Sequence, residues 1–281
     1  MKVIERVAEC RSALEAERAA GRTVGLVPTM GALHDGHRSL VRRAVAAGDV
    51  VCVSVFVNPL QFGPGEDLAT YPRDLAADVH VAERCGAGVV FAPSSEEMYP
   101  PGAATRVRVE GVGDVLEGAS RPGHFEGVAT VVTKLLSIAG RCRAYFGEKD
   151  FQQLVVVRRL VADLSLPAEV VACPTVRALD GLALSSRHRR LSGAEREAAA
   201  VLLRGLQAGA ASILAGERDP AEVRSLMGDV VGAEPLVELD YAEVVDASTL
   251  AVPEKLAGEL RLLVAARVGP TRLIDNLGVR L

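Results

Sequence analysis

The sequence predicts an α/β protein, with a parallel sheet in a larger N-terminal domain and a smaller α+β domain after it. Over the first two thirds of the chain, short Val-rich runs alternate with helical patterns. These runs lack polar–apolar alternation, which is typical of strands that helices cover on both faces. After about residue 176, two helices precede two strand-like runs. We therefore expect domains at residues 1–176 and 177–281.

The expected strands of the first domain are short, and turns or helices separate them. They cover residues 23–27, 50–57, 88–92, 144–147 and 168–173, with a further short strand at 105–109. The expected helices cover residues 1–22, 37–47, 71–85, 125–139 and 150–164. This repeated β–α–β order favours right-handed crossovers and helices on both faces of the sheet, which is a Rossmann-like arrangement.

The second domain begins with a long Ala- and Leu-rich helical pattern over residues 192–215. Ser192 is suited to cap this helix, since Glu195 follows three residues later. A second helix is expected at 220–231, and two strands at 236–245 and 260–268.

Composition disfavours several classes of protein. The 281 residues carry a net charge of −4 without a long basic block, so no nucleic-acid or anionic-membrane surface is expected. No apolar run approaches the roughly 20 residues that span a bilayer, and no signal peptide is evident. The five cysteines are scattered without a C-x-x-C pair, which disfavours disulfides and structural zinc. We expect a cytoplasmic protein without a metal cage.

Ligands of open parallel sheets bind beyond the carboxyl ends of the strands, so the loops there are the candidate sites. The first is the turn at residues 28–37. Gly31 and Gly36 allow a close approach of the main chain, and His34 and His37 flank the expected start of a helix. Such a helix end suits a phosphate, and two imidazoles can donate hydrogen bonds to it. The alternative is an ordinary helix cap.

Two further turns are suited to a nucleotide. At residues 147–153, Lys149 can meet a phosphate, and Asp150 can cap a helix or accept a hydrogen bond from a ribose. At residues 180–187, Ser185, Ser186 and Arg187 offer several donors within one loop, as a triphosphate clamp requires. Either turn can instead be a simple helix cap.

The remaining polar groups are suited to a second substrate. Asn58 and Gln61 follow the strand at 50–57, and their amides can bind hydroxyl or carboxylate groups. A strand-ending turn is the alternative. Arg121, His124 and Glu126 precede the helix at 125–139, where a substrate role and a helix-entry role are equally open.

Four motifs occur in order at residues 28–37, 56–62, 146–153 and 184–187. Together they resemble the pantothenate synthetase (pantoate–β-alanine ligase) family, over about residues 1–280. The H-x-G-H pattern is similar to the HIGH motif of the wider nucleotidyltransferase superfamily. The Ser-Ser-Arg loop is similar to its KMSKS counterpart.

The resemblance implies ATP-dependent ligation of pantoate and β-alanine through a pantoyl adenylate, with AMP and pyrophosphate released. ATP would be a substrate, with Mg²⁺ carried on its phosphates, and the enzyme would be a homodimer. The implied ATP site comprises Met30, Gly31, His34, Gly36, His37, Gly147, Glu148, Lys149, Asp150, Val176, Leu184, Ser185, Ser186 and Arg187. Pantoate would meet Gln61, Gln153 and Asn58.

Among these residues, His34, His37, Lys149 and Arg187 would be catalytic, with His37 as a proton donor. The C-terminal domain would act as a lid. Two positions depart from the family pattern. His188 stands where Asn usually follows Ser-Ser-Arg, and Leu184 where Met is common. The Leu conserves volume, whereas His188 can alter loop capping and the response to pH.

Two other functions compete with the ligase. One is a nucleotidyltransferase that transfers AMP to a phosphorylated substrate. It would need added Arg or Lys near the acceptor loop, and residues 58–62 supply none. The other is a nucleotide-binding regulatory module, which three separate triphosphate-directed loops disfavour.

Overall fold

The computed structural model describes the main chain of residues 1–281 and every side chain except that of Arg189. The chain forms two compact units. The first comprises Met1–Glu148 and Gln152–Pro174, and the second comprises Lys149–Phe151 and Thr175–Leu281. The predicted boundary after residue 176 and the roles of the two domains stay predictions.

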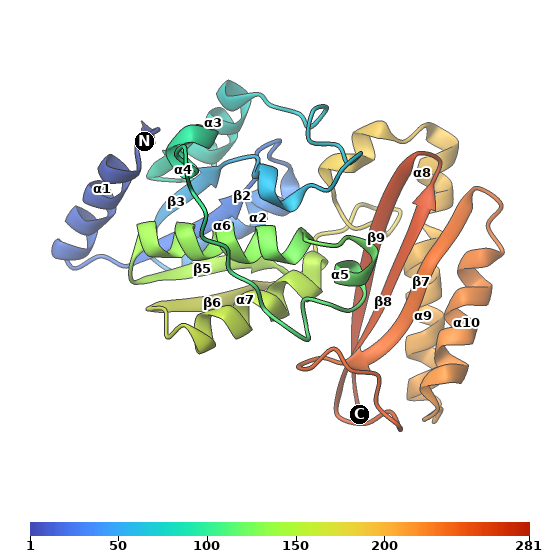
Figure 1. The fold of residues 1–281 in the computed structure, drawn as a ribbon. Helices are drawn as coiled ribbons and strands as arrows, with labels where there is room; N and C mark the ends of the chain where they lie inside the picture. The colour runs from blue at the N-terminus through green and yellow to red at the C-terminus, as the bar shows by residue number, and fades with distance from the viewer. The chain divides into compact units, whose positions relative to one another are not determined.

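The first unit is built on a six-stranded sheet in which every neighbouring pair of strands is parallel. Its strands are β1 (Lys2–Ile4), β2 (Val24–Thr29), β3 (Val50–Val55), β4 (Val89–Phe91), β5 (Cys142–Gly147) and β6 (Ala168–Cys173). Their order is β1-β4-β3-β2-β5-β6 (Figure 1). The chain leaves β2 toward β3 on one side, and β5 lies on the other, so the strand order reverses at β2. The predicted Rossmann-like arrangement is confirmed.

Helices cover both faces of this sheet. The long ones are α1 (Val7–Ala19), α2 (Asp35–Ala46), α3 (Leu75–Arg84), α6 (His124–Ala139) and α7 (Phe151–Asp163). The short ones are η1 (Pro59–Gln61), α4 (Ser95–Met98), α5 (Glu117–Ser120) and η2 (Glu148–Asp150). Figure 1 shows α6 in front of the sheet and α2 behind it. Between α2 and the sheet, Leu40, Val41 and Ala44 pack on buried valines of the central strands.

Two predictions at the start of helices were wrong. Residues 1–22 are not one helix, because Lys2–Ile4 form the edge strand β1 beside β4. Three residues are too short to show a strand pattern. The helix expected from residue 71 begins at Leu75, because the side chain of Asp74 accepts a hydrogen bond from Ala77 N at 3.0 Å and caps it there.

The strand expected at 105–109 does not form. The main-chain N–H of Val107 donates instead to the hydroxyl of Thr130 on α6, at 3.0 Å. At Val107 the main chain thus bonds a helix rather than a neighbouring strand.

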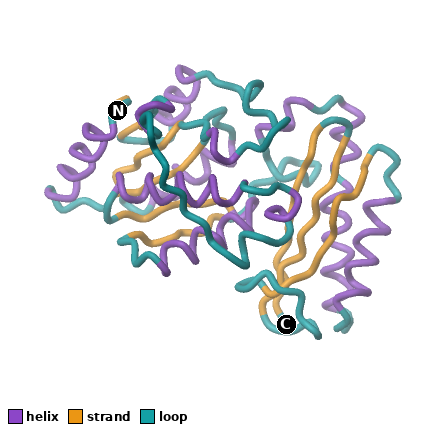
Figure 2. The backbone as a smooth tube through the Cα atoms, viewed as in Figure 1, coloured by secondary structure: helices purple, strands orange, loops and turns teal.

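The second unit has a three-stranded antiparallel sheet that two helices cover on one face (Figures 1 and 2). Its elements are η3 (Ser186–Arg190), α8 (Gly193–Ala199), α9 (Val201–Leu214), α10 (Pro220–Gly232), β7 (Val237–Asp246), β8 (Glu259–Val268) and β9 (Thr271–Arg280). The predicted Ser192 cap is confirmed, with Glu195 completing the capping box. The expected single helix divides at Ala200, and β9 was missed.

One helical stretch, Gly193–Leu214, is long and apolar enough to cross a membrane by length and composition. This corrects the expectation that the chain has no such run. Leu202, Leu206 and Ile213 of the stretch are fully buried against the second sheet and α10. The core of the second unit therefore accounts for its apolar composition.

We predict that Leu206→Ala lowers the free energy of unfolding by roughly 2–5 kcal/mol, because it removes buried methyl groups and leaves a cavity. Leu206 is 0% exposed, whereas Leu214 on the same helix is 67% exposed. Leu214→Ala is the matched control and should change stability by less than about 0.5 kcal/mol. Urea unfolding measures both. Equal losses would contradict the assigned packing of α9.

Candidate active site

A buried carboxylate holds the turn between β2 and α2. Asp78 on α3 is 3% exposed, and its two oxygens accept hydrogen bonds from Ala32 N at 3.0 Å and Leu33 N at 2.7 Å. Gly31 and Ala32 both have positive φ, +82° and +51°. A Cβ on Gly31 would lie 2.7 Å from Asp78 Oδ2. The turn therefore requires glycine there, and Asp78, which the sequence analysis missed, fixes its shape.

The two histidines of the turn cap α2 with their rings. His34 Nδ1 accepts from Gly36 N at 3.1 Å, and His37 Nδ1 accepts from His34 N at 3.3 Å. The ring centroids are 4.1 Å apart. Because each Nδ1 is an acceptor, each neutral ring carries its proton on Nε2. The structure thus pairs two imidazole N–H donors at a helix N-terminus, where an anion is favoured.

Asn58 lies after β3, and its amide is fully used inside the protein. Its Nδ2 donates to Gln61 Oε1 and to Gly127 O, both at 3.0 Å. Its Oδ1 accepts from Tyr99 OH at 2.8 Å and Leu60 N at 3.3 Å. Gly127 permits this because a Cβ there would lie 2.3 Å from Leu60 O. With all four positions satisfied, Asn58 orients its neighbours.

Gln61 meets the histidine-bearing turn. Its Nε2 donates to the sulfur of Met30 at 3.2 Å, so the loops after β2 and β3 converge. One N–H and one acceptor position of this amide remain beyond its bonds to Asn58 and Met30. The geometry therefore suits a polar ligand beside the two imidazoles.

Arg121 and His124 both bond the main-chain carbonyl of Gln61. Arg121 donates to both oxygens of Glu66, at 2.7 and 2.8 Å, and this hydrogen bonding lowers the pKa of Glu66. It also donates to His124 Nε2 at 3.0 Å. Since guanidinium only donates, His124 carries its proton on Nδ1, which donates to Gln61 O at 2.9 Å. Glu126 is not in this network among the contacts of the described side chains.

The adjacent glutamines at the start of α7 have different environments. Gln152 is buried, and its amide bonds Val112 O, Val115 O and Glu117 N. Gln153 is half-buried, and its amide has no hydrogen-bond partner among the side chains and main chain described. Of the two, Gln153 is the one whose amide keeps its hydrogen-bonding capacity, and its predicted contact with pantoate stays a prediction.

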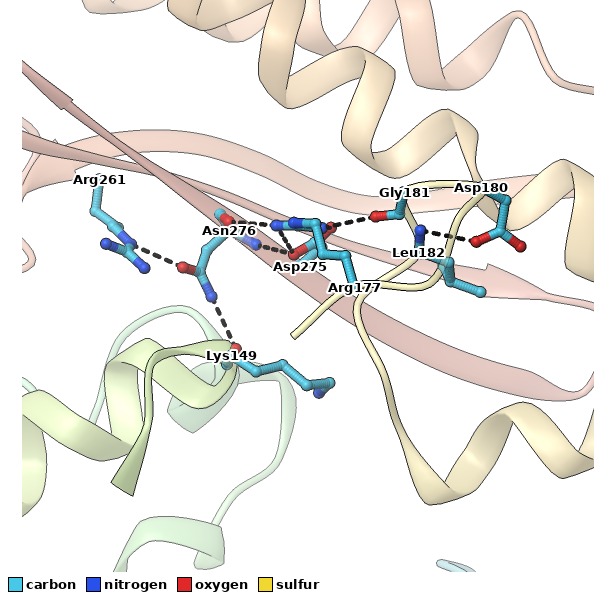
Figure 3. Close-up of polar contacts among 8 residues, drawn as sticks. All are labelled: Lys149, Arg177, Asp180, Gly181, Leu182, Arg261, Asp275 and Asn276. Carbon is cyan, nitrogen blue, oxygen red and sulfur yellow. Dashed lines mark hydrogen bonds and ion pairs between the residues drawn. The ribbon is translucent and has the colours of Figure 1, made fainter. Parts of the chain in front are cut away.

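In the second unit, Lys149 belongs to a turn that β9 holds (Figure 3). Lys149 Nζ lies 3.3 Å from Asp150 Oδ1, and its carbonyl accepts from Asn276 Nδ2 at 2.7 Å. Val176 O accepts from Leu184 N at 2.9 Å, so the predicted adenine and triphosphate residues share one hairpin.

Ser185 caps η3, since its hydroxyl accepts from Arg187 N at 3.3 Å. His188 N donates to Ser185 O at 3.2 Å. The Ser-Ser-Arg sequence therefore opens a helical turn that begins at Ser186, with Ser185 as its N-cap. Among the described residues, no group of three or more His, Cys, Asp or Glu could hold a metal ion.

Burial, followed by the charge of Arg121, lowers the pKa of His124 from 6.5 to about 4. The unfolded chain binds a proton near pH 6.5 that the folded protein binds only near pH 4, so stability should fall as pH drops through that window. The loss is at most about 3 kcal/mol. His124→Gln should remove it, whereas exposed His80→Gln should not. Urea unfolding between pH 7 and 4 measures the difference, and identical slopes for wild type and His124→Gln would contradict it.

The chain is similar to known proteins over nearly its whole length. The family model for pantoate-beta-alanine ligase matches residues 2–278. Pantothenate synthetase of Moorella thermoacetica is 52% identical over 277 residues, covering 99% of this chain and 98% of that protein. The enzyme of Deinococcus radiodurans is 56% identical over 260 residues, covering 90% of this chain and 92% of that protein.

Solved structures of pantothenate synthetases also resemble this chain. Pantothenate synthetase from Thermus thermophilus superposes with a TM-score of 0.93 at 49% identity, covering 99% of both chains. The ligase from Francisella tularensis, complexed with beta-gamma ATP and beta-alanine, gives 0.81 at 34% identity, covering 99% of this chain and 97% of that chain. The family model matches nearly the whole chain, and the Moorella and Deinococcus relatives are more than half identical to it, so the chain belongs to the pantoate–β-alanine ligase family.

Proposed function

We propose that this chain joins pantoate to β-alanine through a pantoyl adenylate, with ATP as the activating substrate. The observation that carries the proposal is the histidine turn at the N-terminus of α2, where Nδ1 of His34 and Nδ1 of His37 each accept a main-chain hydrogen bond. This bonding assigns the proton of each neutral ring to Nε2. Gln61 contacts the same turn through Met30, so an acid held by Gln61 would lie beside these donors. A family relative has been solved with β-alanine bound, which supports the acceptor.

The reaction takes two steps. A carboxylate oxygen of pantoate attacks the α-phosphorus of ATP, so a C–O–P bridge forms and pyrophosphate leaves. The amine of β-alanine then attacks the activated carbonyl, the carbon–oxygen bond to AMP breaks, and the amine loses a proton. The first step concentrates negative charge on phosphate oxygens, where preorganised donors stabilise the transition state most.

In the first unit, His34 and His37 would donate to phosphate oxygens, and His37 would act as the proton donor. Met30, Gly31, Gly36, Gly147 and Glu148 would line the ATP site. Gln61 and Gln153 would bind pantoate through their amides, which support this role by their remaining hydrogen-bonding capacity. Asn58 would act on pantoate through Gln61 rather than by contact.

In the second unit, Lys149 and Arg187 would meet the phosphates, Asp150 the ribose and Val176 the adenine, with Leu184, Ser185 and Ser186 in the phosphate loop. This part of the proposal rests on the sequence motifs. Mg²⁺ would be carried by the ATP phosphates, since the described residues offer no cluster of three ligands. Bound there, it would neutralise phosphate charge.

We further propose a cytoplasmic homodimer that binds neither nucleic acid nor membrane. All five cysteines are free and buried, in keeping with a reducing compartment. A phosphorylated acceptor would need an unpaired cation near Gln61. Arg121 donates to the carbonyl of Gln61, but its charge is already paired with Glu66 at 2.7 Å. This supports a substrate whose only charge is a carboxylate.

We predict that ATP and pantoate alone yield one equivalent of pyrophosphate per active site, while AMP release requires β-alanine. The reason is that the adenylate stays bound until an amine opens it. A rapid-quench assay of pyrophosphate and AMP measures both. Release of AMP at the same rate with any acid, or with no acid, would contradict the ligase function.

His37→Ala should slow pyrophosphate formation by roughly 10²–10³-fold, because it removes one transition-state donor. His37→Gln is the informative second substitution, since the amide of glutamine can donate a hydrogen bond without the imidazole ring. Exposed His80→Ala on α3 is the matched control and should keep the native rate. Single-turnover kinetics measure the step, and a native rate in His37→Ala would remove its catalytic role.

A further inference from the structure

Two consecutive polar residues, Asp275 and Asn276, lie in the middle of β9. Each is only 3% exposed, and apolar residues flank them on both sides. Consecutive residues of a strand point to opposite faces of the sheet. Burying two polar side chains within one strand costs free energy unless their hydrogen bonds are satisfied, so their partners indicate what they do.

Asn276 holds the turn that carries Lys149 (Figure 3). Its Nδ2 donates to Lys149 O at 2.7 Å, and its Oδ1 accepts from Arg261 Nε at 2.7 Å. The guanidinium carbon of Arg261 lies 4.0 Å from the centre of the Phe151 ring. Asn276 and Arg261 thus fix the turn at its Lys149 carbonyl and at its Phe151 ring.

Asp275 holds the hairpin that leads into Ser185. Its carboxylate accepts two hydrogen bonds from Arg177, at 2.6 and 3.0 Å. Arg177 also donates to Gly181 O at 3.0 Å, inside the hairpin, and to Asn276 O at 3.2 Å. Such a bidentate pair fixes direction as well as distance. Through Arg177, Asp275 sets the base of the segment that continues into residues 185–187.

We propose that Asp275 and Asn276 are positioning residues that hold the Lys149 turn and the Ser185–Arg187 loop in one fixed frame. Asn276 acts through the main chain of Lys149, and Asp275 acts through Arg177. A misplacement of about 1 Å at reacting groups can cost on the order of 10²-fold in rate. The inference rests on the proposed ATP-binding roles of Lys149 and residues 185–187.

Asn276→Asp is the direct test, because it keeps the volume and the acceptor for Arg261 but replaces the donor to Lys149 O with an oxygen. The measurement is single-turnover pyrophosphate release with saturating ATP and pantoate, in the native and Lys149→Ala backgrounds. We expect a loss of roughly 10–100-fold in the native background and below about 3-fold in Lys149→Ala, since a residue that acts through another shows strong coupling with it.

Glu259→Gln is the matched control. It changes an exposed carboxylate of β8 in the same sheet, which pairs with Arg280 at 3.7 Å, so it should keep the native rate. If Asn276→Asp does not fold, Arg261→Lys provides a second variant, because lysine loses the planar contact with Phe151 and should show the same dependence on Lys149.

Equal losses in both backgrounds, or none in either, would overturn the positioning role while leaving the ligase function standing. Wild-type protein that releases no pyrophosphate with pantoate would overturn the ligase function, and with it this inference.

Discussion

The turn between β2 and α2 keeps its shape because the buried carboxylate of Asp78 accepts hydrogen bonds from two consecutive N–H groups. The base of the turn is tied to β3, since Thr29 Oγ1 donates to Ser54 O at 2.6 Å and accepts from Gly31 N at 3.1 Å. With both ends fixed, the main chain presents His34 and His37 in one orientation. The donors that we assign to the phosphates therefore depend on a carboxylate that holds the main chain of their turn.

Buried polar side chains also position other residues elsewhere in the molecule. Asn58, Arg121 and His124 direct hydrogen bonds to the side chain or carbonyl of Gln61. Asp275 and Asn276 bond other loops of the second unit. Buried polar groups with complete partners hold the main chain, while the amides of Gln61 and Gln153 keep hydrogen-bonding capacity for the substrate that we propose.

Much of the first sheet could be predicted from the sequence, because Val-rich runs such as Val50–Val55 are typical of strands that are buried on both faces. The edge strand β1 could not be predicted because it has only three residues. The strand β9 could not because Asp275 and Asn276 interrupt the apolar pattern of its sequence. The histidine turn was legible as a motif. Asp78 was not, because it lies 46 residues from Ala32, although a carboxylate on the buried face of α3 beside Ala82 is a usable signal.

The central claim is that a pantoate carboxylate oxygen attacks the α-phosphorus of ATP. Pantoate labelled with oxygen-18 in its carboxylate tests this directly, because the bridging oxygen stays with the phosphorus when β-alanine opens the adenylate. After a complete turnover, mass spectrometry should find one labelled oxygen in AMP and none in pyrophosphate. Label in orthophosphate or pyrophosphate, with unlabelled AMP, would contradict the account.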